Sequence, residues 1–178
     1  MKKLPVITAL ICLAFLFTQC KDLLDVEEDI SFVAVFNVNT QQESFTRSQI
    51  YDLASNVDVI EEYGSKIKEV NINRVEIWIT SLQAVEGQTF SGGSISVSRQ
   101  DGSGETLVAS LGGLVIQDLL NNKTTLTHNS EGIKLLGNLA ADPPHRFQLH
   151  TQGDINEGPL AFIINMEFTG KMVANPLN

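Results

Sequence analysis

Glu76, Trp78 and Thr80 are the residues whose types and spacing best suit the binding of a ligand. They alternate with valine and isoleucine along residues 75–80, so on a β-strand they would share the face opposite the apolar side chains. An outward-facing tryptophan beside a carboxylate and a hydroxyl is an arrangement that stacks on sugars or peptides. The alternative is that a helix or a neighbouring loop covers Trp78 and forms a second small core.

The acidic residues offer a second kind of chemistry, because two carboxylates can hydrolyse a glycosidic bond. The chain has 21 acidic residues, and two that are distant in sequence can be close in space, so no pair is singled out. The run Asp101–Glu105 (DGSGE) carries oxygen ligands at alternate positions, as a calcium loop does, but it lacks the later bidentate acid of an EF-hand. We interpret this run as a hairpin turn rich in turn-forming residues.

The three histidines do not form a metal-binding pattern. His145 and His150 differ by five positions, so on one strand they would point to opposite faces, and His128 stands apart. The sequence has no His-x-His pair, no HExxH motif and no cysteine companion for them. It also lacks a G-x-S-x-G elbow, a G-x-G-x-x-G loop and a Walker A motif. We therefore predict no metal ion, no cofactor and no catalytic residue.

Alternating apolar residues predict that β-strands must position these side chains. The pattern is clearest in residues 160–168, where every second residue is apolar, and we expect this strand to be central. Residues 30–38 alternate in the same way, and so do residues 66–82, with a change of phase near Asn73-Arg74 that is typical of a β-bulge. The turn at residues 101–104 predicts a hairpin.

The last third of the chain is also predicted to be a hairpin, in which the strand around residues 147–149 pairs with residues 160–168. Residues 39–48 are polar and are predicted to be a loop. Residues 112–142 are ambiguous between strand and helix, because short apolar runs do not distinguish the two. Within them we favour a helix over residues 131–140.

Two segments carry signals of helix. In residues 48–63 the apolar residues recur at spacings of three and four, which predicts one or two short helices ending at Gly64 as a C-cap. Ser130 is the predicted N-cap of the helix at 131–140, and Pro143-Pro144 ends that segment. The expected fold is therefore mainly β. It is an antiparallel β-sandwich of about seven strands, immunoglobulin-like or similar, with one to three short connecting helices.

The first twenty-two residues have the pattern of an export signal. Lys2 and Lys3 precede fourteen uncharged residues (Leu4–Phe17), and Cys20 follows soon after. This stretch resembles a bacterial lipoprotein signal peptide, although Phe17 and Gln19 replace the leucine and the small residue usual at these places. The resemblance implies cleavage before Cys20 and attachment of a lipid to its thiol. The alternatives are a plain secretory signal with a chance cysteine, or an uncleaved N-terminal anchor.

Lys21 and Asp22, followed by further acids up to Asp29, resemble the export signal of Bacteroidota lipoproteins. That resemblance implies display on the outer face of the outer membrane, with the periplasmic face as the alternative. The same charges also suit a solvated tether. We accordingly divide the chain into a signal peptide (1–19), a lipidated cysteine with an acidic tether (20–29) and one sandwich domain (30–178).

Composition restricts the partners of the mature protein. Of the 12 basic residues, loss of Lys2 and Lys3 leaves 10 against 21 acidic residues, a net charge of −11. This charge repels phosphate backbones and argues against nucleic acid as a partner. Cys12 lies in the signal peptide and Cys20 would carry lipid, so the domain has no disulfide.

These observations favour an outer-membrane or cell-surface lipoprotein whose domain is a non-catalytic binding or assembly module. Its expected partners are the membrane, through the N-terminal lipid, and an envelope protein or a glycan. The alternative is a hydrolase of a surface polymer that uses a carboxylate pair. Such an enzyme would need a cleft in which one acid is buried beside apolar side chains, so that its pKa rises.

Overall fold

The strands of this protein pair in a nested order: the first pairs with the last, the second with the second-last, and so on inward. The structure is a computed structural model that describes residues 25–83 and 87–177. Its strands are β1 (Val26–Thr40), β2 (Ser44–Asp52), β3 (Ile67–Gln83), β4 (Phe90–Arg99), β5 (Thr106–Ser110), β6 (Thr124–Thr125), β7 (Arg146–Ile155) and β8 (Leu160–Ala174). Its helical elements are α2 (Asp58–Tyr63), η1 (Gly64–Lys66), η2 (Gln117–Leu119) and α3 (Ser130–Ala141).

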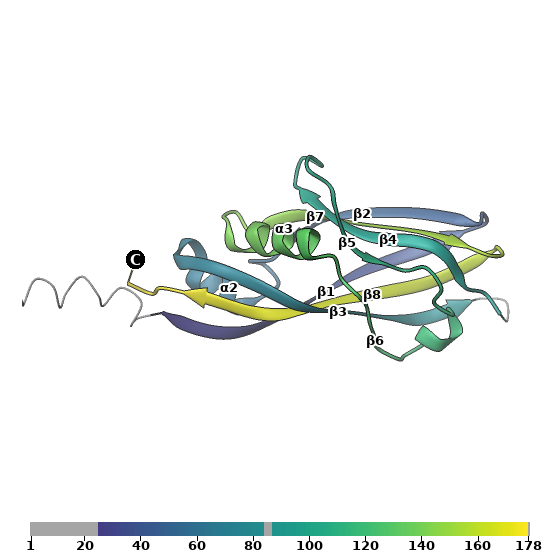
Figure 1. Cartoon of the computed structure of the whole chain (residues 1–178), viewed down its shortest axis with the longest axis horizontal. Helices are drawn as coiled ribbons and strands as arrows, with labels where there is room; N and C mark the ends of the chain where they lie inside the picture. The colour runs from purple at the N-terminus through teal and green to yellow at the C-terminus, as the bar shows by residue number, and fades with distance from the viewer. Residues whose placement is uncertain (1–24, 84–86, 178) are drawn as a thin grey trace, which may run out of the picture.

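The pairs β1–β8, β2–β7, β3–β6 and β4–β5 are all antiparallel. β8 also pairs with β3, and β7 with β4, so that two four-stranded sheets form. Sheet A has the order β1-β8-β3-β6 and sheet B the order β2-β7-β4-β5 (Figure 1). The predicted antiparallel sandwich is confirmed. Its strand order is that of an eight-stranded jelly roll and differs from the immunoglobulin order that served as our example.

The core lies between the two sheets and is filled by alternate side chains of the long strands. Phe32 stacks on Phe168 with ring centres 5.0 Å apart, and Tyr51 lies 5.2 Å from Phe32. Farther along the sandwich, the ring of Phe45 meets that of Phe162 edge-on at 5.6 Å. Both groups join sheet A to sheet B, and aromatic pairs of this kind add to the stabilisation that burial provides.

Helix α3 closes one side of the sandwich. A Cβ atom on Gly132 would lie 1.9 Å from the carbonyl oxygen of Leu107 on β5, and one on Gly137 would lie 2.3 Å from that of Val70 on β3. The helix backbone therefore contacts both sheets directly. Leu136, on the inner face of the helix, is fully buried. Only glycine allows so close an approach at these two positions.

The opposite side is closed by side chains of β2 that bond to the edge of β1. Arg47 donates from Nε to the carbonyl of Asn37 at 3.0 Å and from Nη2 to that of Asn39 at 3.3 Å. The Tyr51 hydroxyl donates to the carbonyl of Val33 at 3.2 Å. These bonds occupy backbone acceptors on an edge strand, which would otherwise be available to another chain.

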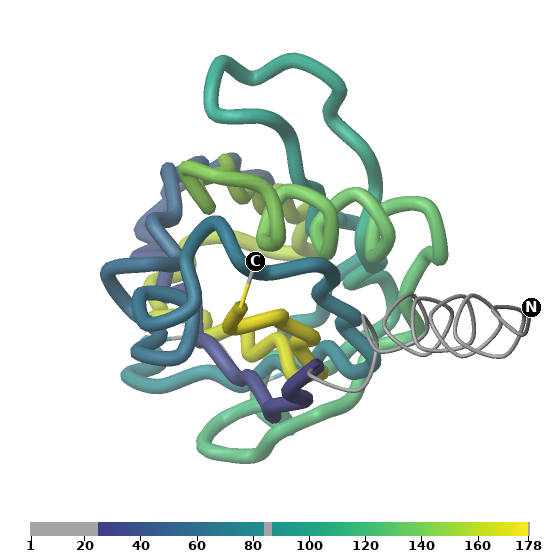
Figure 2. The backbone as a smooth tube through the Cα atoms, turned by 90° about the vertical axis from the view of Figure 1, so that its left-hand side faces the viewer, coloured from purple at the N-terminus to yellow at the C-terminus, as the bar shows by residue number. Residues whose placement is uncertain are grey.

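The sandwich is elongated, and its two ends differ. β1 starts and β8 stops at the same end, where Val26 pairs with Ala174; we call this the N-terminal end (Figure 1). The turn at residues 40–44 and the connection at residues 155–160 lie at the opposite end, which we call the distal end. The turn between β4 and β5 projects beyond the rest of the chain (Figure 2).

The structure corrects the predicted boundaries in the first third of the chain. Residues 20–29 were predicted to be a tether, but β1 begins at Val26. Residues 39–48 were predicted to be a loop, but β2 begins at Ser44. In residues 48–63 one short helix, α2, is confirmed, but the segment begins with the end of β2, because pairing of β2 with β7 outweighs the local helical spacing there. The C-cap at Gly64 is confirmed.

The hairpin predicted in the last third is wrong. β7 belongs to sheet B and β8 to sheet A, so their connection crosses between the sheets. The hairpin of β4 and β5 is confirmed, and a register shift between Ile72 and Arg74 confirms the predicted bulge. The predicted helix at 131–140 is confirmed as α3. Its N-cap is Asn129 and not Ser130, because the Asn129 side chain accepts hydrogen bonds from the backbone of Glu131 and Gly132.

Candidate functional site

The candidate site lies on the outer face of sheet A. Alternation places Glu76, Trp78 and Thr80 of β3 on this face, as predicted, while Ile77 and Ile79 between them are fully buried. The register sets Glu76 opposite a second glutamate on β8, and sets Trp78 opposite Asn165. β3 and β8 therefore present polar side chains side by side, β1 contributes Val33 and Val35 to the same two rows, and the segment around β6 adds polar groups from the edge.

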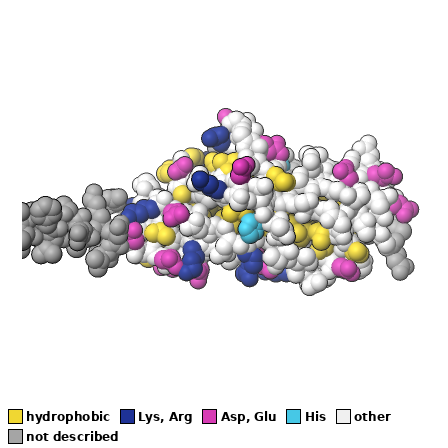
Figure 3. All heavy atoms as spheres, viewed as in Figure 1, with side chains coloured by type: hydrophobic (Ala, Val, Ile, Leu, Met, Phe, Trp, Pro, Cys, Tyr) yellow, Lys and Arg dark blue, Asp and Glu magenta, His cyan; other side chains and the backbone are white. Residues whose placement is uncertain are grey.

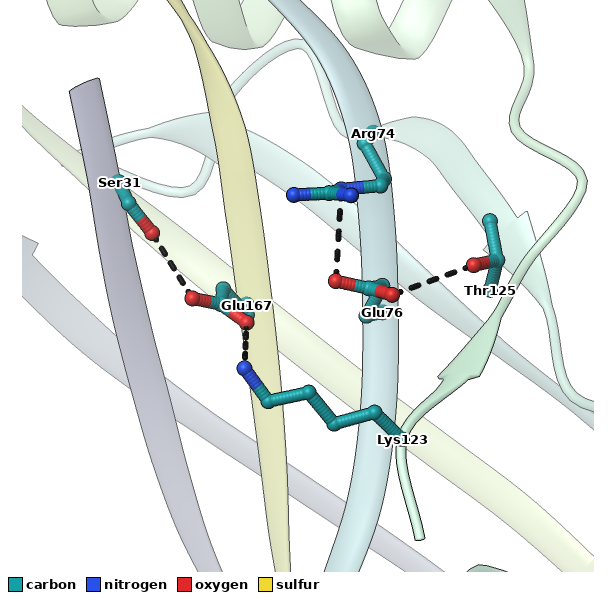
Figure 4. Close-up of polar contacts among 6 residues, drawn as sticks. All are labelled: Ser31, Arg74, Glu76, Lys123, Thr125 and Glu167. Atoms are coloured by element: carbon teal, nitrogen blue, oxygen red, sulfur yellow. Dashed lines mark hydrogen bonds and ion pairs between the residues drawn. The ribbon is translucent and has the colours of Figure 1, made fainter. Parts of the chain in front are cut away.

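The two glutamates of this face, Glu76 and Glu167, are each satisfied by their own partners (Figure 4). Glu167 accepts a hydrogen bond from Ser31 of β1 at 2.9 Å and forms an ion pair with Lys123. Glu76 lies 3.4 Å from Nε of Arg74. It also accepts a bond from the hydroxyl of Thr125 at 3.3 Å.

Lys123 lowers the pKa of Glu167 by hydrogen bonding to its carboxylate, and the bond from Ser31 adds to this effect. Partial burial acts in the opposite direction but is outweighed. Glu167 is thus held ionised and oriented at neutral pH. A carboxylate in this state can accept hydrogen bonds from a ligand, whereas a general acid needs a raised pKa.

Trp78 is half-buried, and the group that the structure places over its indole is Lys123. The Lys123 Nζ atom lies 4.8 Å from the ring centre, so the same ammonium contacts both Trp78 and Glu167. Asn165 fixes the neighbouring backbone by donating from Nδ2 to the Trp78 carbonyl at 3.4 Å. It also donates to the Thr80 hydroxyl at 3.1 Å. The predicted trio is therefore part of one connected polar surface.

Sequence reasoning found the residues of β3 but missed their partners. Glu167 and Asn165 occupy outward positions of β8, where polarity opposite the apolar parity was a usable signal. Lys123 and Thr125 belong to the turn and the short strand β6, and Ser31 belongs to β1. Their contacts depend on strand pairings between distant parts of the chain, so no local sequence pattern predicts these contacts.

The other predicted candidates lie elsewhere. In the Asp101–Glu105 turn, the Asp101 carboxylate accepts bonds from the backbone and hydroxyl of Ser103 at 2.9 and 2.7 Å. These bonds lower the pKa of Asp101. The turn is thus held by its own side chains, as a hairpin turn is.

The three histidines lie apart from one another. His150 is on the outer face of sheet B, where Ser48 and Ser98 contact its two ring nitrogens at 2.8 Å each. His145 is buried ahead of β7 and donates from Nδ1 to the carbonyl of Ala140 at 2.9 Å. Within residues 25–83 and 87–177, no three His, Cys, Asp or Glu side chains gather as a metal site would require.

Cys20, Lys21 and Asp22 lie outside the described residues. Among the helices that are described, none is long and apolar enough to cross a membrane.

Comparison with known proteins assigns no family. No family model matches the chain. No curated protein matches it either. Among solved structures, it is similar to one described as Desmodium yellow mottle tymovirus, with 12% sequence identity. That match covers 84% of this chain and 87% of the other, with a TM-score of 0.30, a likeness too low to carry any functional argument.

Proposed function

We propose that this protein is a lipid-anchored outer-membrane or cell-surface protein whose jelly roll is a non-catalytic binding or assembly module. The membrane is its first partner, through a lipid on Cys20, and an envelope protein or a glycan is its second. Lys21 and Asp22 act as the export signal in this proposal, which favours the cell surface over the periplasmic face. The observation that carries the proposal is how closely β1 follows the cysteine.

Asp25 lies five positions after Cys20, and an extended chain of that length spans at most about 17 Å. Asp25 is already attached to the sandwich, because Lys68 contacts its carboxylate at 2.7 Å. Lys171 of β8 pairs with Glu27 of β1 at the same end. Basic and acidic side chains are interspersed there (Figure 3). An acylated Cys20 would therefore hold the N-terminal end of the sandwich close to the bilayer surface.

The direction and length of β1 then determine which end of the sandwich lies far from the membrane. β1 has 15 residues, which extend about 46 Å at the usual rise of a strand. The distal end would accordingly lie tens of ångströms from the membrane. The outer face of sheet A runs along this length and is open to partners from the medium. A long module held at one end suits recognition of a large partner beyond the lipid headgroups.

The charges on that face favour binding over hydrolysis. The carboxylates nearest each other in register, Glu76 and Glu167, each have a basic partner. A glycan hydrolase with a carboxylate pair would need one acid with a raised pKa, and the pKa of Glu167 is shifted downward. Preformed ion pairs and an anchored tryptophan instead make a rigid surface, which lowers the cost of ordering side chains when a partner binds.

A matched pair of exposed aliphatic residues tests which face binds. Val35 lies on the outer face of sheet A and is 45% exposed, whereas Ile50 lies on the outer face of sheet B and is 53% exposed. A photo-reactive amino acid would replace each in turn in the full chain, and intact cells would be irradiated. We expect a discrete adduct from position 35 and none from position 50. Adducts from position 50 alone, or from neither position, would contradict the proposed binding face.

A further inference from the structure

The outer face of sheet A has an open hollow of about 330 Å³ at the distal end. A space of this size is at the lower end of the range for small-molecule sites. The hollow is formed by neighbouring positions of β1, β8 and β3. The residues that line it are Asn37, Val38, Asn39, Ser81, Gln83, Ala161, Phe162 and Ile163.

The lining is uncharged in a strongly acidic protein. Asn37, Asn39 and Gln83 contribute exposed amide groups, each with two N–H donors and one oxygen acceptor. Among the described residues, no other side chain or backbone group bonds to these three amides. Ala161 and Ile163, both partly buried, provide an apolar floor between them. An apolar surface flanked by neutral donors and acceptors suits a ligand with many hydroxyl groups and no charge.

The rim of the hollow is held in place from below. The Arg47 guanidinium bonds to the backbone carbonyls of both Asn37 and Asn39, as described above, and so fixes this part of β1. In the register of the sheet, Ala161 lies between Asn39 on one side and Gln83 on the other. Asn39 and Gln83 therefore flank one small side chain on this face of the sheet.

The hollow is continuous with the candidate site. The next row of the sheet toward the N-terminal end contains Asn37, Ile163 and Thr80, and the row after it contains Asn165 and Trp78. Successive outward rows of a strand are about 7 Å apart. A ligand that fills the hollow and extends along β3 would thus reach the indole, whose face can stack on a sugar ring.

We infer that this hollow binds a neutral glycan chain, with the amides of Asn39 and Gln83 bonding to sugar hydroxyls over Ala161. The inference rests on the proposed function, in which the outer face of sheet A binds the partner. It goes further by naming the class of ligand and the end of the face that takes it. The uncharged lining and the overall negative charge both disfavour acidic polysaccharides.

Affinity electrophoresis tests the inference with the full chain, extracted from membranes in a polyoxyethylene detergent. The gels would contain dextran, mannan or a soluble β-glucan as neutral probes, and alginate as an acidic one. Ala161→Arg fills the hollow and should abolish retardation by a neutral polymer. Gln83→Ala should weaken binding about fivefold to tenfold, as the loss of one hydrogen bond implies. Gln152→Ala, an exposed glutamine on the outer face of sheet B, is the matched control and should bind as the unmodified chain does.

Denaturation midpoints would establish that the variants are folded, and Asn39→Ala replaces Ala161→Arg if the arginine prevents folding. The inference is overturned if no neutral polymer retards the unmodified chain, or if retardation persists when the hollow is filled or its amides are removed. Stronger retardation by alginate would overturn it as well. Adducts at position 35 without retardation would reject the glycan and leave the proposed binding face intact.

Discussion

Gly132→Ala tests how closely α3 packs on β5. Helix propensity predicts that this substitution raises the free energy of unfolding, whereas the packing contact predicts that it lowers it. Alanine stabilises a helix interior by up to about 1 kcal/mol over glycine. In this fold its Cβ would lie 1.9 Å from the Leu107 carbonyl oxygen, so the helix must retreat by about 1.1 Å to reach even 3.0 Å. Overpacking of this kind costs about 1–3 kcal/mol, and a backbone obstacle places the cost near the upper value. We expect a net destabilisation of about 2 kcal/mol.

Urea denaturation followed by circular dichroism would measure this change. For a chain of this size, 2 kcal/mol corresponds to a decrease in Tm of roughly 4–8 °C. Asn138→Ala is the control, since residue 138 is an exposed position of α3 where alanine improves helix propensity without a buried contact. Equal or greater stability of Gly132→Ala would refute the close contact between α3 and β5.

Three further predictions follow from the polar contacts. Arg47→Met removes the donors to the β1 edge and should destabilise the fold by about 1–2 kcal/mol and promote aggregation, as measured by denaturation and light scattering. Because the pKa of Glu167 is lowered in the folded state, its stabilisation is present above its ordinary pKa of 4.5 and is lost as pH falls through the lower folded value. Glu167→Gln should therefore cost less than about 1 kcal/mol at pH 7, with a difference that shrinks in denaturation below pH 4.5. The Ser98 hydroxyl donates to a backbone carbonyl and must accept from His150, so nitrogen NMR should show His150 protonated at Nε2.

Local patterns predicted the elements that local forces decide. Alternation in β8 identified a strand that is indeed central in sheet A, between β1 and β3. The change of phase near Asn73-Arg74 identified a real bulge, because a slip of one residue would turn the apolar set outward. The turn between β4 and β5 was predictable for a related reason. In a jelly roll, β4 and β5 are the one pair of consecutive strands joined directly by a hairpin within a sheet.

Pairings between distant strands could not be predicted in this way. β7 and β8 are adjacent in the chain and each alternates, which is what a hairpin would also show, but they belong to opposite sheets. β2 was hidden because Arg47 and Gln49 interrupt its apolar parity, while Ile50 and Leu53 mimic a helical spacing. Pairing with β7 makes that segment a strand, and β7 is too distant in the sequence for a local pattern to reveal this pairing.

The candidate site also combines residues that local sequence predicted with residues that it did not. Parity alone placed Glu76, Trp78 and Thr80 on one outward face, and the structure agrees. The features that give this face its character come from elsewhere in the chain. Lys123 reaches it from the turn before β6, and Glu167 meets Glu76 only through the register of β3 with β8. Such partners follow from topology, which a single sequence does not reveal.

The central claim is that a lipid on Cys20 holds this jelly roll at the membrane by its N-terminal end. The most direct measurement is metabolic labelling with a tagged fatty acid, comparing the full chain with Cys20→Ser in a Bacteroidota host and recovering both from the membrane and soluble fractions. We predict label in the unmodified chain and in the membrane fraction, and neither label nor membrane association in Cys20→Ser. Label that persists in Cys20→Ser, or is absent from the unmodified chain, would contradict the anchor and the orientation derived from it.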